Sequence, residues 1–170
     1  MANQFPKQSQ DRQPGLEHEM TPAPEIIRDD YRGSGKLEGK KAIITGGDSG
    51  IGRSAAVHFA REGADVAVMY LDEHQDAEET KRLIETEGRR ALLISGDVRD
   101  SDFCHQAVDQ VLKEFGEINI LVNNAAAQVV REDITDIPDD EWRETFDVNI
   151  HGYFYMAKAA VKHLPKGGAI

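Results

Sequence analysis

The chain has 170 residues and a formal net charge of -11, from 31 acidic residues against 20 Lys and Arg. This length suffices for one domain with a buried core, whereas the acidic balance argues against nucleic acid and anionic membranes as partners. No apolar run approaches the roughly 20 residues that a membrane span needs. The N-terminus also lacks the apolar stretch of a signal peptide, so we expect a cytoplasmic location, which fits the single cysteine, Cys104.

Residues 1–39 differ in composition from the rest of the chain. Four of the six prolines lie there among Gln, Asp and Glu, and almost no periodic apolar pattern is present. Such a segment predicts a flexible or surface-draped arm, because it buries too little apolar surface to offset the entropy of ordering it. The alternative is an arm that wraps a neighbouring subunit, with Ile26, Ile27 and Tyr31 as anchors.

The central feature of residues 40–170 is a short apolar run that breaks into a glycine-rich turn. Ile43 and Ile44 predict a buried strand, and Ile51, Ala55 and Phe59 recur at every fourth residue, which predicts a helix after the turn. The turn glycines allow backbone angles that other residues avoid. A strand that enters a helix in this way directs unpaired N–H groups at one point, where an anion such as a phosphate is favoured.

Two phosphate-binding motifs fit this turn. Residues 47–54 read as G-x-x-x-x-G-Arg-Ser, which departs from a P-loop because Arg53 stands where that motif has Lys. Residues 45–52 read as T-G-x-x-x-G-x-G, a dinucleotide-binding turn of Rossmann type. The turn by itself leaves both interpretations open.

The rest of the chain alternates strands and helices. Apolar runs at 65–70, 91–94 and 118–122 predict three further strands, and residues 167–170 resemble the entry to a fifth. Helices are predicted at about 73–87, from a cap at Ser101 to 116, and from Pro138 through to Pro165. We therefore predict an α/β fold with a Rossmann-type doubly wound parallel sheet, truncated at the fifth strand. The histidines form no metal-binding motif, so we expect no metal.

Three motifs in order together resemble the short-chain dehydrogenase/reductase family. They are residues 45–52, the run Asn123-Asn124-Ala125-Ala126, and Asn149 in the last helix. The resemblance extends from about residue 36 to 170, and it favours the dinucleotide turn over the P-loop. The leader with residues 13–15, Gln-Pro-Gly, further resembles a bacterial subgroup with an N-terminal arm, related to glucose-dehydrogenase-like and general-stress oxidoreductases.

The resemblance implies a binding site for NAD or NADP. The implied contacts lie in the glycine turn and at the ends of the next three strands: Gly46, Asp48, Ser49, Gly50, Ile51, Gly52, Tyr70, Leu71, Asp72, Asp97, Val98, Asn124 and Ala125. The Asp97 carboxylate is a suitable acceptor for the adenine amine. Asp72 and Glu73 would repel a 2'-phosphate and tolerate a hydroxyl, so we expect NAD to be preferred over NADP.

The same resemblance implies hydride transfer between the nicotinamide cofactor and a small alcohol or carbonyl substrate, through Asn, Ser, Tyr and Lys side chains. Of these four the chain contains Asn149, to which the resemblance gives the positioning of a water in the proton relay. Tyr153 and Tyr155 have no Lys four residues on. We therefore expect an N-terminal fragment that is inactive alone and belongs to a homo-oligomeric enzyme. The alternative is a non-catalytic module that binds nucleotides or a subunit.

Overall fold

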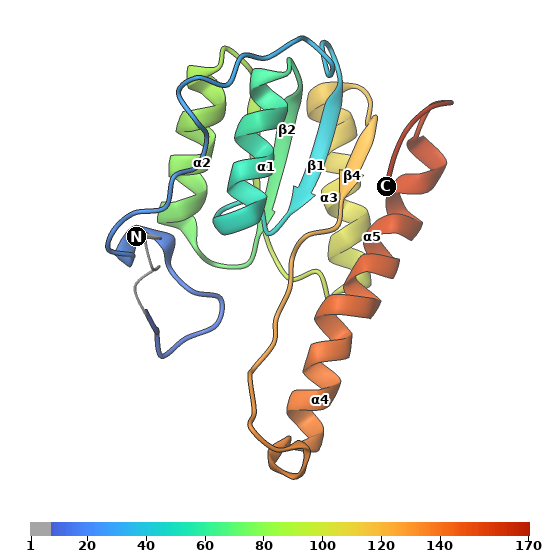
Figure 1. Cartoon of the computed structure of the whole chain (residues 1–170). Coiled ribbons are helices and arrows are strands. Elements are labelled where there is room, and N and C mark those ends of the chain that lie inside the picture. The colour runs from blue at the N-terminus through green and yellow to red at the C-terminus, as the bar shows by residue number, and fades with distance from the viewer. Residues whose placement is uncertain (1–7) are drawn as a thin grey trace.

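A parallel sheet of four strands forms the centre of the molecule in the computed structural model, which describes residues 8–170. The first residues of the predicted arm, 1–7, lie outside the described residues. The strands follow the order β3-β2-β1-β4 (Figure 1) and are β1 (Lys41–Thr45), β2 (Asp65–Tyr70), β3 (Ala91–Ser95) and β4 (Ile120–Val122). Beyond β4, Ala169 forms a parallel bridge with Ile120.

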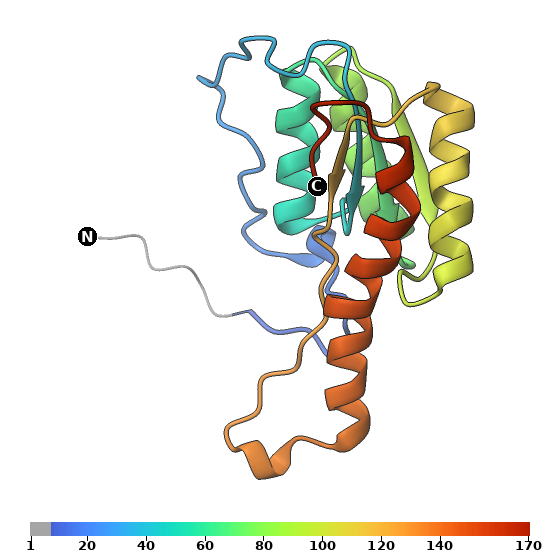
Figure 2. The ribbon, with the colours of Figure 1, turned by 90° about the vertical axis from the view of Figure 1, so that its right-hand side faces the viewer.

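Helices cover both faces of the sheet (Figures 1 and 2). One face carries α1 (Gly50–Arg61) and α2 (His74–Thr86), and the other carries α3 (Ser101–Phe115) and a long C-terminal helix. The long helix is built from α4 (Asp139–Phe146), the π-helical segment η3 (Asp147–Gly152), α5 (Tyr153–Ala160) and the 3-10 turn η4 (Val161–His163). Two further 3-10 turns are η1 (Glu17–Glu19) and η2 (Ile134–Asp136). The predicted α/β fold of Rossmann type is confirmed.

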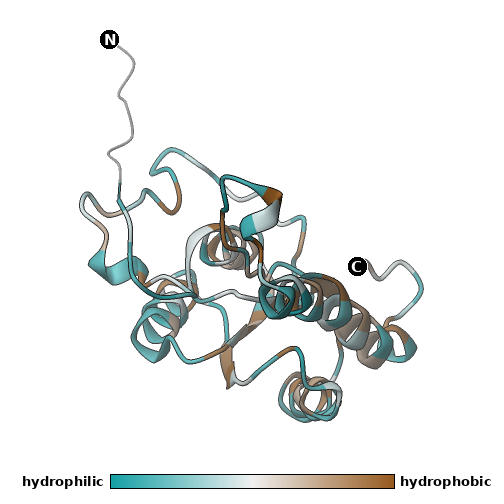
Figure 3. Ribbon diagram, turned by 90° about the horizontal axis from the view of Figure 1, so that it is seen from below, coloured by the Kyte–Doolittle hydropathy of each residue, from teal (hydrophilic) through white to brown (hydrophobic). Residues whose placement is uncertain are grey.

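The strands are apolar on both sides because each side packs against helices. Ile44, Val66 and Val68 belong to the core under α1 and α2, whereas Ile43 and Met69 belong to the core with α3 and α5. In Figure 3 the brown strands lie among the helices, which carry polar, teal segments on their outer sides. Such two-sided burial is typical of parallel sheets and explains why the strands are continuous apolar runs in the sequence.

Two predicted element boundaries are wrong. Asp100, not Ser101, caps α3, since its carboxylate accepts hydrogen bonds from the N–H groups of the second and third helical residues. The fourth strand begins at Ile120 rather than at residue 118. Just before it, the side chain of Asn119 accepts the N–H of Lys41 at 2.7 Å, while the backbone N–H of Asn119 donates to the Lys41 carbonyl at 2.9 Å.

The buried face of α1 also differs from the predicted one. Ile51 is 83% exposed, and Ala56, Val57 and Ala60 are the apolar side chains buried on this helix. The reason lies at the start of the helix, where Gly52 packs directly against the preceding turn and thereby fixes the rotation of α1 over the sheet.

Residues 8–39 run over the surface of α1 and α2 before they enter β1, as the blue segment of Figure 1 shows. The Ser54 hydroxyl donates to the Ile26 carbonyl at 2.8 Å, and the Tyr31 hydroxyl donates to the Glu62 carboxylate. The arm is therefore attached to α1 and to the residue that follows it in its own chain, at two of its predicted anchors. Within the described part of the chain, no helix has the length and apolar character to cross a membrane.

Candidate nucleotide-binding site

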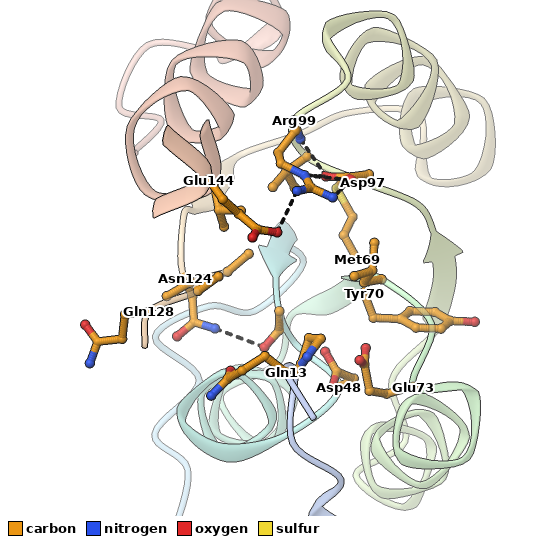
Figure 4. A pocket seen from close by; sticks show the side chains of 18 of the residues that line it. Gln13, Asp48, Met69, Tyr70, Glu73, Asp97, Arg99, Asn124, Gln128 and Glu144 are labelled. Atoms are coloured by element: carbon orange, nitrogen blue, oxygen red, sulfur yellow. Dashed lines mark hydrogen bonds and ion pairs between the residues drawn. The ribbon is translucent and has the colours of Figure 1, made fainter. Parts of the chain in front are cut away.

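A pocket of about 300 Å³ lies at the carboxyl ends of the four strands (Figure 4). It is lined by residues that follow each strand, among them Gly46 after β1, Leu71 after β2, Asp97 after β3 and Asn124 after β4. The chain crosses from edge strand β3 back to β4, which pairs with β1 on the side opposite β2. The pocket thus lies at the point where the strand order reverses, where open α/β sheets bind their ligands.

The glycine turn brings the start of α1 against the end of β1. Gly46 has a φ of 60°, in the left-handed region that favours glycine. A Cβ added at Gly52 would lie 1.8 Å from the carbonyl oxygen of Gly46. Only a residue without a side chain fits there, so the first turn of α1 is held directly at the edge of the pocket.

Hydrogen bonds fix the floor of the pocket between β1 and β4. The Asn124 amide donates to the carbonyl oxygens of Thr45 at 3.0 Å and Gly46 at 2.9 Å. The Thr45 hydroxyl oxygen in turn accepts the N–H groups of Asn124 at 2.9 Å and Ala125 at 3.0 Å. Asn123 is tied to the long helix, because its amide donates to the Tyr153 carbonyl at 3.3 Å. The turn after β4 is therefore held in one conformation.

Arg53, the residue at the position of the P-loop lysine, does not line this pocket. Its guanidinium is buried and donates to the Asp48 carbonyl at 2.9 Å, the Thr80 hydroxyl at 2.8 Å and the Asp76 carbonyl at 2.9 Å. The P-loop interpretation is therefore wrong: this side chain holds α1 and α2 together instead of facing a phosphate.

Two acidic groups occupy the pocket wall beside β2. Asp48 and Glu73 both line it and are 4% and 3% exposed, and burial raises the pKa of each carboxyl group. Asp72 lies next to Glu73 but outside the lining, and hydrogen bonding with Glu73 and Arg12 lowers its pKa. Tyr70 lines the wall with its ring, and its hydroxyl pairs with Nδ1 of His74 at 3.0 Å, pointing away from the pocket centre in Figure 4.

The opposite end of the pocket carries a chain of charged groups. Burial alone would raise the pKa of Asp97, but hydrogen bonds from the side chain and backbone of Arg99 lower it. Arg99 also pairs with Glu144 of α4 at 2.8 Å, so the loop after β3 is connected to the long helix (Figure 4). Val98 lines the pocket beside this pair and contacts the helix at Gly152.

Asn149 lies in the π-helical segment of the long helix. Its amide donates to the carbonyl of Ala127 at 2.6 Å and to that of Thr145 at 2.7 Å, and both of these residues line the pocket. A π-helical turn inside an α-helix is rare and occurs frequently at functional sites. Asn149 is therefore fixed behind the pocket wall, joining the helix to the loop after β4.

Most of the predicted cofactor contacts come together here. Nine line the pocket: Gly46, Asp48, Ser49, Tyr70, Leu71, Asp97, Val98, Asn124 and Ala125. Five predicted site residues lie outside the lining, namely Gly50, Ile51, Gly52, Asp72 and Asn149. The N–H of Gly50 has a partner that the sequence did not suggest, the carboxylate of Glu17 in the arm.

The sequence reasoning missed Gln13 and Pro14 of the arm, together with Arg99 and Glu144, as lining residues. The Gln-Pro-Gly run of the leader was the available signal for the first two. Within residues 8–170, no cluster of His, Cys, Asp and Glu side chains is placed to hold a metal ion.

The comparisons with known proteins agree with this geometry. A sequence model described as short chain dehydrogenase matches residues 40–170, so the chain belongs to the short chain dehydrogenase family. General stress protein 39 of Bacillus subtilis (strain 168) is 51% identical over 173 residues, which cover 100% of this chain and 60% of that protein. The chain spans 56% to 60% of the length of the curated relatives that it matches first.

Two solved structures show the same fold with a dinucleotide. One is a short chain dehydrogenase from Burkholderia cenocepacia J2315 in complex with NADP, which is 38% identical to this chain with a TM-score of 0.73. The match covers 78% of this chain and 54% of that protein. The other is carveol dehydrogenase from Mycobacterium avium in complex with NAD, which is 32% identical to this chain with a TM-score of 0.73. The match covers 79% of this chain and 52% of that protein.

Proposed function

We propose that the chain is the nucleotide-binding part of an NAD(P)-dependent oxidoreductase that transfers hydride between the cofactor and an alcohol or carbonyl substrate. The main support is the pocket at the strand-order reversal, with the start of α1 packed against the end of β1 through Gly52. A glycine turn of this kind presents backbone N–H groups and the positive end of a helix dipole to a diphosphate. Here Gly46 and Ser49 line the pocket, whereas the N–H of Gly50 is bonded to the Glu17 carboxylate. The bound nicotinamide ring would supply the hydride chemistry, and the residues of this chain would bind and orient the cofactor.

Each end of the pocket suits a different part of a dinucleotide. The loop after β3 offers the Asp97 carboxylate, which suits the exocyclic amine of adenine. The acidic wall beside β2 suits the adenosine ribose, whose hydroxyls donate to carboxylates. Asp72 and Glu73 supply two carboxylates against the one guanidinium of Arg12. We therefore propose that NAD is preferred over NADP, because these carboxylates, with Asp48 beside them in the pocket wall, outnumber the guanidinium and would repel a 2'-phosphate.

For Asn149 we propose a positioning role in proton transfer. The amide ties the π-helical segment to the Ala127 carbonyl at the pocket wall, and from this place it would help to order a water near the substrate. This role rests on the hydrogen bonds of the side chain and on its place beside the pocket. The remaining proton-transfer groups would come from outside the described residues.

We also propose that the protein is cytoplasmic and forms homo-oligomers. The single cysteine fits a reducing compartment. Trp142, Phe146, Ile150 and Phe154 are between 39% and 57% exposed along the long helix, and an apolar stripe of this kind is typical of a subunit interface. Cell fractionation and sedimentation of the purified protein test the two statements separately.

The experiment for the proposed function uses the protein at the full length encoded by its gene. Small alcohols and sugars are supplied with NAD or NADP, and the appearance of the reduced cofactor is followed by absorbance. Substrate-dependent reduction supports the assignment. The catalytic part of the proposal would be contradicted if the protein bound either dinucleotide but none of the alcohols reduced the bound cofactor and no carbonyl compound oxidised it.

A further inference from the structure

The N-terminal arm forms part of the wall of the pocket. Gln13 and Pro14 line it together with Asp48 and Glu73 (Figure 4). These two arm residues lie about 60 positions before β2 ends in the sequence, yet the fold places them at the same end of the pocket. The adenosine end of the site is therefore shaped by a segment outside the part of the chain that the family model matches.

A buried charged cluster fixes the arm in this place. The Glu17 carboxylate accepts the N–H of Gly50 at the start of α1 and pairs with the guanidinium of Arg53. The Asp76 carboxylate on α2 accepts the N–H groups of Glu17 at 2.9 Å and His18 at 3.0 Å. Glu17, Arg53 and Asp76 are all buried, with exposed fractions of 7%, 5% and 1%. Charge-assisted hydrogen bonds among buried groups are strong and directional, so the arm has one defined position over α1 and α2.

From this position the arm carries one cation to the acidic wall. The Arg12 guanidinium lies 2.7 Å from Oδ1 of Asp72 and 3.3 Å from Oε1 of Glu73, and its Nε donates to the Pro14 carbonyl at 3.0 Å. Asp72 and Glu73 are the second and third residues after the end of β2, the region where dinucleotide-binding folds discriminate between a 2'-hydroxyl and a 2'-phosphate. Arg12 thus bridges two carboxylates for which the sequence alone suggests no cationic partner.

We propose that the arm completes the adenosine end of the pocket and that Arg12 sets how strongly this end rejects a 2'-phosphate. The inference rests on the proposed function, since it presupposes a dinucleotide in the pocket. With Arg12 in place, its guanidinium offsets part of the negative charge of Asp72 and Glu73. Without Arg12 both carboxylates act unopposed on the 2' position. NADP(H) then loses affinity while NAD(H), which carries a hydroxyl there, is affected far less.

The test compares the dissociation constants of NADH and NADPH for the full-length protein and three variants, measured by fluorescence titration at low ionic strength. Arg12→Gln is expected to raise the NADPH to NADH ratio of dissociation constants about tenfold, an effect of the size of one lost charge-assisted contact. Arg12→Lys keeps the charge and should keep most of the wild-type ratio. The matched control is Arg82→Gln, which removes the same charge from an exposed pair with Glu79 on α2 and should leave the ratio unchanged.

The outcomes separate this inference from the proposed function. An unchanged ratio in Arg12→Gln, with both dinucleotides still bound, overturns the role of Arg12 and leaves the oxidoreductase assignment intact. An equal increase in Arg12→Gln and Arg82→Gln overturns it as well, because the effect would then be one of net charge. If the wild-type protein binds neither dinucleotide, both proposals fail. Arg12 has a side chain that is 41% exposed, so its replacement should leave the fold in place.

Discussion

Replacing Gly52 by Ala tests the packing of the glycine turn, because packing and helix propensity predict opposite effects on stability. Gly52 lies in the first turn of α1, where propensity alone predicts that Ala is more stable by about 1 kcal/mol. The structure predicts the opposite sign. The added Cβ would lie 1.8 Å from the Gly46 carbonyl oxygen and 2.7 Å from Nδ2 of Asn124, so the turn must move. Overpacking of this kind costs about 1–3 kcal/mol, and the strained Asn124 hydrogen bond adds about 1 kcal/mol.

The propensity gain of about 1 kcal/mol offsets part of this cost, so urea unfolding of the full-length protein should show a net loss of about 1–3 kcal/mol for Gly52→Ala. NADH affinity should fall with it, because the start of α1 no longer meets the turn. Gly116→Ala is the control: it has a φ of 85° and open space for a Cβ, so it should cost about 1 kcal/mol of strain and leave NADH binding unchanged. A Gly52→Ala protein as stable as the wild type, with unchanged NADH affinity, would refute the packing argument.

Three further variants test other parts of the site and the arm. Thr45→Val leaves two backbone N–H groups after β4 without their acceptor, so urea unfolding should show a loss of about 2–4 kcal/mol. Asn149→Ala should lower kcat about 100-fold with little change in NADH affinity, as steady-state kinetics and titration would show; unchanged kcat would remove its proposed role. Glu62, whose pKa is lowered to about 2 by hydrogen bonds from Tyr31 and from backbone N–H groups, stabilises the fold fully above about pH 4.5 and loses this effect as the pH falls towards 2. The Tm difference between wild type and Glu62→Gln should therefore be largest at neutral pH and shrink in acid, and a constant difference would contradict the assigned contact.

The fold was predictable because its signals are local. A buried strand such as β1 is a short apolar run, and the change of period after it marks α1. The pocket followed from the same signals, since parallel strands end at one edge of the sheet and their following residues must meet there. Nine of the predicted contacts line the pocket for this reason.

What the sequence did not predict depends on contacts between distant residues. The sequence predicts Ser101 as the cap of α3, whereas the side-chain hydrogen bonds of the folded chain give this place to Asp100. The place of the arm depends on Glu17 reaching Arg53, 36 positions away, and composition gives no sign of such a pair. For the same reason the sequence presents Arg53 as a candidate phosphate ligand and gives no sign that Asp72 pairs with Arg12, 60 positions before it.

The central claim is that the pocket at the carboxyl ends of the strands binds a nicotinamide dinucleotide. Calorimetric titration of NADH into the full-length protein at neutral pH measures this most directly. We predict saturable binding at a single site per chain, weakened by Gly52→Ala and unaffected by Gly116→Ala. A wild-type protein that shows no heat of binding with either NADH or NADPH would contradict the claim.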